Sequence, residues 1–192
     1  MNFLSTQSLT ALKTLGDHSG NAMMLRRVPE RIRKTGMSKL TTLCYIRKND
    51  RYLMLYRNRK KKDENAGKWI GVGGKVKEGE SPDDCLLREV FEETSLKLTS
   101  YRYKGLITFV SDIYETEYMF LYEGISWTGE LSEDCDEGSL AWIPFDEIMD
   151  LPLWEGDRLF LPELISGKED IRMRLVYEGD TLSSYRIYGN DK

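Results

Sequence analysis

Apolar and polar residues alternate in several short runs from residue 40 onward, which is the pattern of strands that bury one face. Turn-forming residues at Lys48, Asn49 and Asp50 separate the first two runs. The alternation predicts strands at 40–47, 51–57, 102–110, 114–123 and 138–143, and a closing hairpin formed by 171–177 and 183–188. Segments with helical signals lie between these strands, so the sequence indicates an α/β (α+β) fold.

The clearest helix signal begins at Ser81. Ser81 is a good N-cap, Pro82 suits the first helical position, and Asp83 and Asp84 complement the positive end of the helix dipole. The apolar flank on which this helix can pack consists of Leu86, Leu87 and Val90. Two shorter helices are predicted, one beginning with 144–147 and the other at 156–166.

Three glutamates of the first helix, Glu89, Glu92 and Glu93, stand at positions i, i+3 and i+4. Their carboxylates therefore project from one helical face, with Cβ atoms about 5–6 Å apart. Such crowded like charges are most easily tolerated when cations lie among them, and Mg2+ prefers carboxylate oxygens, waters and substrate phosphates as ligands. The spacing favours a site for metal and phosphate. The alternative meaning of clustered glutamates is a solvated acidic helix face.

The apolar run at 69–74, which precedes this helix, ends in glycines. Glycines permit unusual backbone angles and a close approach of the main chain to a ligand or metal. Gly73, Gly74 and Lys75 could suggest a phosphate-binding P-loop. The first glycine of that motif is absent, however, and Val76 replaces its Ser or Thr, so the P-loop interpretation is set aside.

Residues 74–96 resemble the Nudix box, Gly-x5-Glu-x7-Arg-Glu-apolar-x-Glu-Glu-x-Gly-apolar. The pattern is met at every position except one, where Ser95 stands in place of the usual glycine. The spaced polar positions are Gly74, Glu80, Arg88, Glu89, Glu92 and Glu93. On this match the chain is identified as a member of the Nudix hydrolase family.

The likeness extends from about Leu40 to Tyr188 and looks most like the MutT/MutX branch, which hydrolyses oxidised purine nucleoside triphosphates. The stretches that carry it are 67–93, 105–109, 136–142 and 154–157. The resemblance implies the Nudix fold, an α/β/α sandwich around a mixed β-sheet with a catalytic loop-helix-loop. It places a Nudix hydrolase domain at 39–192 and leaves residues 1–38 as an N-terminal extension.

The N-terminal extension has no strand-like alternation and contains the single histidine, His18, which has no partner for a metal site. Its basic cluster consists of Arg26, Arg27, Arg31, Arg33 and Lys34. The extension is either a disordered segment or expression leader, or a basic arm that touches an anionic partner. The basic loop at 57–65 likewise has two interpretations, a solubilising loop or a lip that attracts a triphosphate.

The family resemblance also implies the metal ligands. They are Glu89, Glu92 and Glu93 of the helix, Glu137 of a downstream loop, and the carbonyl oxygen of Gly73. The expected cofactor is Mg2+, with Mn2+ able to substitute. A divalent cation at this position would neutralise charge that builds on the phosphates and lower the pKa of bound water.

The expected catalytic residues are Glu93, Glu92, Glu89 and Arg88. Glu93 is the first candidate for aiding water activation, and Glu92 is the second because one helical turn carries both. Arg88 is expected to orient the carboxylates by ion pairing rather than to act on substrate. Glu80 is expected to be structural or an outer-shell metal ligand.

For substrate binding, the resemblance implies a pocket wall and mouth made of Thr42, Leu43, Arg57, Trp69, Phe109, Trp154 and Asp157. An aromatic face can stack on a purine, while a carboxyl group accepts from its hydrogen-bonding edge or, when protonated, donates to it. The alternative for the aromatic residues is ordinary core packing. Ile70 and Gly156 depart from the mammalian relative, which has an asparagine and an aspartate at these positions, so the base preference stays open.

Composition sets the remaining limits. The chain has 192 residues, 40% of them hydrophobic and 31% charged, which fits one soluble globular domain. Its formal net charge of -4 argues against a stable nucleic-acid complex. Cys44, Cys85 and Cys135 lack paired metal-ligand spacing, which favours reduced thiols and a cytoplasmic location. No run is apolar enough for a membrane span, and a monomer or homodimer is expected.

The leading functional hypothesis is a Mg2+-dependent pyrophosphohydrolase that converts 8-oxo-dGTP, or a related oxidised purine nucleotide, to the monophosphate and pyrophosphate. A second hypothesis keeps the catalytic site but changes the substrate to a dinucleoside polyphosphate, a nucleotide sugar or a capped RNA end. A third is a nucleotide-binding module without hydrolysis. Substituting Glu93 separates the enzymatic hypotheses from the third.

Overall fold

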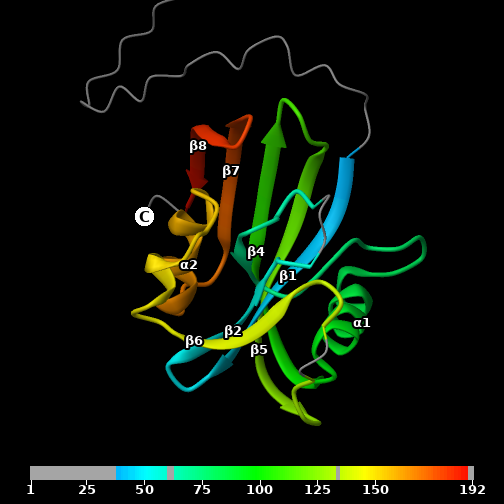
Figure 1. The fold of residues 1–192 in the computed structure, drawn as a ribbon. Helices are drawn as coiled ribbons and strands as arrows, with labels where there is room; N and C mark the ends of the chain where they lie inside the picture. The colour runs from blue at the N-terminus through cyan, green and yellow to red at the C-terminus, as the bar shows by residue number, and fades with distance from the viewer. Residues whose placement is uncertain (1–37, 60–62, 133–134, 190–192) are drawn as a thin grey trace, which may run out of the picture. The chain divides into compact units, whose positions relative to one another are not determined.

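The protein is described by a computed structural model that covers residues 38–59, 63–132 and 135–189 (Figure 1). The strands are β1 (Ser38–Lys48), β2 (Arg51–Tyr56), β3 (Trp69–Ile70), β4 (Lys97–Ser111), β5 (Thr116–Thr128), β6 (Ser139–Pro144), β7 (Ile171–Glu178) and β8 (Thr181–Tyr188). The helices are α1 (Pro82–Thr94), the 3-10 helix η1 (Ile148–Asp150) and α2 (Asp157–Ile165). The predicted N-terminal extension lies outside the described residues apart from Ser38, as does the middle of the basic loop.

The strands of the described segments form one mixed sheet. Its order is β3-β2-β1-β5-β4-β7-β8, and β6 also pairs with β2. Two pairs, β1 with β5 and β4 with β7, are parallel, whereas β1–β2, β4–β5 and β7–β8 are antiparallel. The predicted closing hairpin is therefore present as β7 and β8.

The helices α1 and α2 cover opposite faces of the sheet (Figure 1). Leu86 and Val90 of α1 are fully buried in one hydrophobic cluster, which includes Ile46 of β1. On the other face, Phe160 and Leu164 of α2 are fully buried in a second cluster. Each helix thus buries its apolar flank on the sheet, and the predicted mixed α/β/α sandwich is confirmed. Within the described segments, neither helix has the length and apolar character needed to cross a membrane.

Two strands extend five residues beyond an end that their sequence patterns predicted. β4 begins at Lys97 rather than at residue 102, and β5 continues to Thr128 rather than ending at 123. The pairing of β4 with β5 shifts register near Leu98, Ser100 and Tyr103. These irregularities interrupt the two-residue alternation that marks a strand in sequence, so the extra residues were missed.

The prediction of a helix beginning at Pro144 was wrong. Pro144 is the last residue of β6 and pairs with Arg51 of β2. The next backbone N–H, of Phe145, donates to the carbonyl oxygen of Asp50 at 2.9 Å, which keeps the chain attached to the turn after β1. The only helical structure that follows directly is the single turn η1.

Gly105 marks the place where β4 passes between β5 and β7. Its φ is +149°, and a Cβ built there would lie 1.8 Å from the carbonyl oxygen of Ile171 in β7. A side chain at this position would therefore force the paired strands apart. Close pairing of β4 with β7 depends on glycine here.

We expect the Gly105→Ala variant to lose about 3 kcal/mol or more of unfolding free energy, because strain and a backbone clash combine. Gly179→Ala is the matched control, since Gly179 also has a positive φ (+58°) but open space around its Cβ position. The control should lose about 1 kcal/mol. Urea unfolding followed by tryptophan fluorescence measures both, and equal small losses would contradict the steric argument.

Candidate active site

The acidic helix α1 is fixed at both ends. Its first turn carries a reciprocal cap, in which the Asp84 N–H donates to Ser81 Oγ at 3.1 Å and the Ser81 N–H donates to Asp84 Oδ2 at 3.0 Å. At its C-terminus, Ser95 adopts a φ of +62° and its N–H donates to the Phe91 carbonyl at 2.9 Å. Ser95 therefore takes the left-handed conformation that glycine adopts more easily, and the helical spacing of the glutamates is kept.

Arg88 joins three carboxylates on the exposed face of α1. Its Nε and Nη2 atoms donate to the two oxygens of Glu80 at 2.6 and 2.8 Å. Its Nη1 atom donates to Glu89 at 2.5 Å and to Glu92 at 3.1 Å. The hydrogen bonds from Arg88, helped by the Lys77 N–H, lower the pKa of Glu80 to about 2. Arg88 is placed to orient carboxylates, and Glu80 is placed to hold Arg88.

Glu93 lies on the buried side of α1 against the glycine loop. It is only 6% exposed, and its Oε2 accepts a hydrogen bond from the Gly73 N–H at 2.9 Å. Burial raises the pKa of Glu93 to about 8, and the charges of Glu89 and Glu137 act in the same direction against the opposing effects of Gly73 and Arg57. Negative charge is therefore costly here without a cation nearby.

The glycine loop touches the helix directly. A Cβ on Gly73 would lie 2.1 Å from the Thr42 carbonyl oxygen, and one on Gly74 would lie 2.5 to 2.7 Å from the carboxyl atoms of Glu89. The loop is held to β1 by backbone hydrogen bonds from the Thr42 N–H to Gly74 and from the Cys44 N–H to Val72. Glycines are needed where loop, strand and acidic helix meet.

Arg57 brings Glu137 to this corner from a distant part of the chain. Its Nη2 lies 2.5 Å from Glu137 Oε2, and its Nη1 lies 3.9 Å from Glu93 Oε1. On its other edge, Nε donates to Asp63 Oδ2 at 2.6 Å. The Arg57 side chain is 13% exposed, so these ion pairs are largely shielded from water. The predicted metal ligands Glu93 and Glu137 thus share one guanidinium.

The chemistry of this cluster suits a hard divalent cation, because its side-chain donors are all carboxylate oxygens. In the described segments no three acidic, histidine or cysteine side chains converge closely enough to hold an ion. Guanidinium groups stand among the carboxylates instead, with Arg88 on Glu89 and Glu92 and Arg57 on Glu137. The glutamates would hold a cation after side-chain rearrangement, so the residues present fit such an ion.

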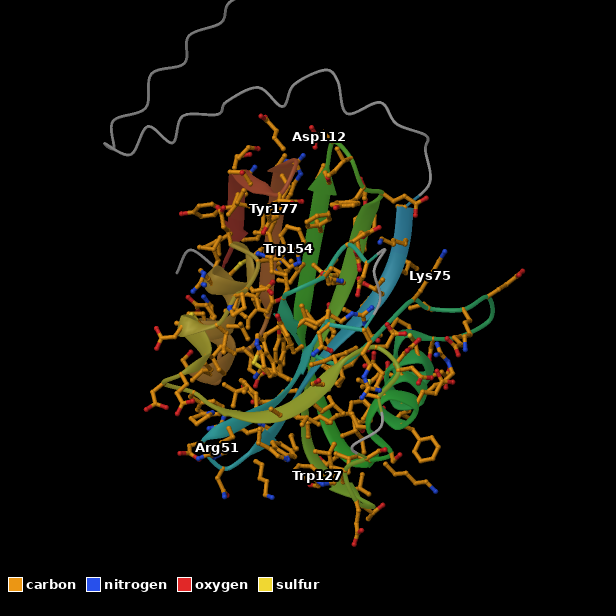
Figure 2. All side chains as sticks on the ribbon, viewed as in Figure 1. Arg51, Lys75, Asp112, Trp127, Trp154 and Tyr177 are labelled. Atoms are coloured by element: carbon orange, nitrogen blue, oxygen red, sulfur yellow. The ribbon has the colours of Figure 1, made fainter. Side chains whose placement is uncertain are left out.

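A cavity of about 220 Å³ opens beside the acidic cluster. Its lining includes Thr41, Leu43, Arg57, Asn65, Gly73, Gly74, Phe109, Met119, Trp154, Asp157 and Tyr177. Trp154 and Tyr177 lie edge to face with ring centroids 5.5 Å apart (Figure 2), and Phe109 lies 4.9 Å from Tyr177 and 6.4 Å from Trp154. One wall is therefore aromatic, and another is the glycine loop that contacts Glu89 and Glu93.

Asp157, the first residue of α2, is the buried carboxyl group of this cavity. It is 8% exposed, and burial raises its pKa to about 7, although the charges of Lys68 and Arg158 and a backbone hydrogen bond near Trp154 oppose the rise. A carboxyl group with this pKa is partly protonated near neutral pH. It can therefore donate a hydrogen bond to a ligand as well as accept one.

The loop between β2 and β3 is fastened over the cavity at two points. Lys39 Nζ lies 2.9 Å from Glu64 of the loop and 3.4 Å from Glu117 of β5. The Trp154 Nε1–H donates to Asn65 Oδ1 at 2.8 Å. The hydrogen bond from Trp154 to Asn65 means that the loop, as well as packing, sets the orientation of the Trp154 ring.

The predicted substrate residues are brought together except for one. Thr42, Leu43, Arg57, Phe109, Trp154 and Asp157 line the cavity. Trp69 is not among the lining residues and instead stacks on Tyr56, with ring centroids 5.2 Å apart, while its neighbour Ile70 lines the cavity. The Thr42 hydroxyl lies 3.5 Å from Cys85 Sγ of α1, so this side chain points toward the helix.

Sequence reasoning missed several lining residues, namely Thr41, Glu64, Asn65, Tyr114, Glu117, Met119 and Tyr177. Thr41 is 7% exposed, and its hydroxyl has no hydrogen-bond partner among the described residues. Strand alternation could have found it, because Thr41 shares a face of β1 with Leu43. Glu64 and Asn65 lie in a loop, where no periodic signal exists.

Comparisons with known proteins agree with this geometry. Residues 37–164 match the NUDIX domain model, which is more than half of the chain. The chain is 35% identical to an oxidized purine nucleoside triphosphate hydrolase of Danio rerio, over 68% of this chain and 82% of that protein. It is 31% identical to the uncharacterized Nudix hydrolase YvcI of Bacillus subtilis, over 76% of this chain and 92% of that protein.

Solved structures give the same result. A mutator MutT protein from Bacillus halodurans has a TM-score of 0.70 and 27% identity, over 78% of this chain and 97% of that chain. The chain therefore belongs to the Nudix hydrolase family, within which it is similar to MutT proteins. The family prediction made from the box is confirmed.

The raised pKa of Asp157 predicts a pH-dependent stability. Between about pH 4, its unfolded pKa, and about pH 7, its folded pKa, the folded protein binds a proton that the unfolded chain has released. The contribution of protonated Asp157 to the free energy of unfolding is therefore fully present below about pH 4 and is lost as the pH rises through 7. Relative to Asp157→Asn, the wild type should lose a few kcal/mol of unfolding free energy across this window. Urea unfolding at several pH values measures the difference, and parallel curves would contradict the prediction.

Proposed function

We propose that the protein is a Mg2+-dependent hydrolase that converts an oxidised purine nucleoside triphosphate, such as 8-oxo-dGTP, to the monophosphate and pyrophosphate. The observation that carries the proposal is the shared wall between an aromatic cavity and an acidic helix. Gly73, Gly74 and Arg57 line the cavity, and they also contact Glu93, Glu89 and Glu137. A nucleotide with its base in the cavity would place its phosphates at the carboxylates.

The zebrafish relative is named for this activity, and so is a relative from Mus musculus that is 30% identical over 78% of this chain and 94% of that protein. These names describe the relatives. They support the same substrate class for this chain because the similarity covers more than two thirds of this chain and more than four fifths of each relative.

The residues of the acidic cluster take distinct roles in the proposed reaction. Mg2+, when bound by Glu89, Glu92, Glu93 and Glu137, supplies charge neutralisation for the phosphates and a lower pKa for water. Glu93 is the first candidate to accept the proton of the attacking water, because it is buried beside the cavity wall. Arg88 keeps Glu89 and Glu92 in position through the hydrogen bonds described above.

Base recognition would rest on the aromatic wall and on polar side chains of the cavity. Phe109 and Trp154 can contact a planar ring, and Asp157 can donate to or accept from its edge. Ile70 and Gly156 provide no polar side chain. The buried Asp157 carboxyl and the buried, unpaired Thr41 hydroxyl would therefore contribute to discrimination between one purine and another. An activity of this kind would serve nucleotide-pool sanitation.

The test is a substrate panel with Mg2+, containing 8-oxo-dGTP, dGTP, ATP, diadenosine polyphosphates and ADP-ribose. We expect kcat/KM for 8-oxo-dGTP to exceed that for dGTP by about tenfold or more, because a buried group matched to the oxidised edge is left unpaired by the normal base. Separation of the products by chromatography identifies the monophosphate and pyrophosphate.

Two variants make the panel decisive. Glu93→Gln should reduce kcat by about 10²-fold to 10⁴-fold if Glu93 acts in proton transfer. Glu163→Gln is the control, since Glu163 pairs with Lys168 on the surface of α2. Faster turnover of another panel member would contradict the proposed substrate but not the proposed Nudix chemistry. Failure to hydrolyse any panel member would favour a nucleotide-binding module without hydrolysis.

A further inference from the structure

Arg57 occupies the boundary between the cavity and the acidic cluster. It lines the cavity, and its guanidinium reaches Asp63, Glu93 and Glu137. Among the described residues that line this cavity it is the only lysine or arginine. An anionic group in the cavity therefore has a cationic partner on the side of the acidic cluster.

The two ends of this guanidinium have different partners. Nε donates to Asp63 Oδ2 at 2.6 Å. Asp63 is itself held in the loop between β2 and β3, because its Oδ1 accepts from the Asn65 N–H at 3.0 Å. The Nη atoms face the predicted metal ligands, with Glu137 at 2.5 Å and Glu93 at 3.9 Å. Asp63 anchors one edge of the fork, so the other edge can change partners without loss of the anchor.

The position of Arg57 conflicts with simultaneous metal binding by Glu93 and Glu137. An oxygen that binds a divalent cation at close range holds a guanidinium less strongly, since the two positive charges repel each other. The absence of three converging ligands in the described segments fits this conflict. A cation bound through Glu137 Oε2 would therefore compete with Arg57 for this oxygen.

We propose that Arg57 is a positioning residue that exchanges partners: it holds Glu137 and Glu93 in the metal-free protein, yields Glu137 to a divalent cation, and then binds a phosphate of the ligand. In the metal-free protein the guanidinium supplies the positive charge that the metal would supply. In the metal-bound protein it assists phosphate binding. This inference rests on the proposed function because it requires a divalent cation and a phosphorylated ligand at this corner.

The exchange predicts opposite effects of one substitution. Removing the guanidinium in Arg57→Gln removes a competitor for Glu137, so Mn2+ should bind the nucleotide-free protein about tenfold more tightly. The same variant lacks the phosphate contact, so KM for 8-oxo-dGTP at saturating metal should rise about tenfold or more, with a smaller change in kcat. A merely structural ion pair would not give this pair of opposite shifts.

The metal arm of the experiment is an electron paramagnetic resonance titration of Mn2+ without nucleotide. Arg172→Gln is the matched control, because Arg172 pairs with Asp170 at a more exposed site on β7. It should leave the Mn2+ affinity and KM unchanged. Equal or weaker Mn2+ binding by Arg57→Gln than by the wild type overturns the proposal, as does failure of both proteins to bind Mn2+.

Wild-type protein provides a second measurement if Arg57→Gln does not fold. The side-chain NMR signals of Arg57 should shift when Mg2+ is added without nucleotide, and unchanged signals overturn the proposal. The metal arm is also independent of substrate identity. If the panel shows another substrate while Mn2+ affinity rises in Arg57→Gln, the exchange stands and the 8-oxo-dGTP assignment falls.

Discussion

Negative charge crowded at one corner of the sheet is the constraint on which the rest of the site depends. Glu89, Glu92 and Glu93 project from α1, and Glu137 arrives from beyond β5. Helical spacing fixes the first three relative to one another, and the caps at Ser81 and Ser95 keep that spacing. Carboxylates this close together repel one another unless positive charge lies among them. Arg57 and Arg88 supply that charge in the structure.

The same constraint explains the close approach of the glycine loop. Gly73 donates its N–H to Glu93, and Gly74 lies against Glu89 with no room for a side chain. Gly73 and Gly74 also line the cavity, so the same loop borders both the acidic cluster and the cavity with its aromatic wall. The two features that a nucleotide needs, a place for its base and a place for its phosphates, thereby lie next to the same loop.

Local sequence signals predicted the parts of the protein that depend on local geometry. The cap at Ser81, the glutamate spacing and the pairing of Arg88 with its neighbours all follow from helical periodicity. The family match supplied the fold and the long-range link to Glu137. Parts that depend on tertiary contacts were missed, as for Trp69, which packs on Tyr56, and for the start of β4, which lies beyond a bulge. The loop residues Glu64 and Asn65 are held at the cavity by contacts with Lys39 and Trp154, which no local pattern predicts.

The most direct test of the account is a crystal structure of the protein with Mn2+ and a non-hydrolysable analogue of 8-oxo-dGTP. We predict anomalous Mn2+ peaks among Glu89, Glu92, Glu93 and Glu137, the oxidised base against Phe109 and Trp154, and Arg57 detached from Glu137 and in contact with a phosphate. Mn2+ bound elsewhere, with the base outside the cavity and the pair of Arg57 with Glu137 intact, would contradict it.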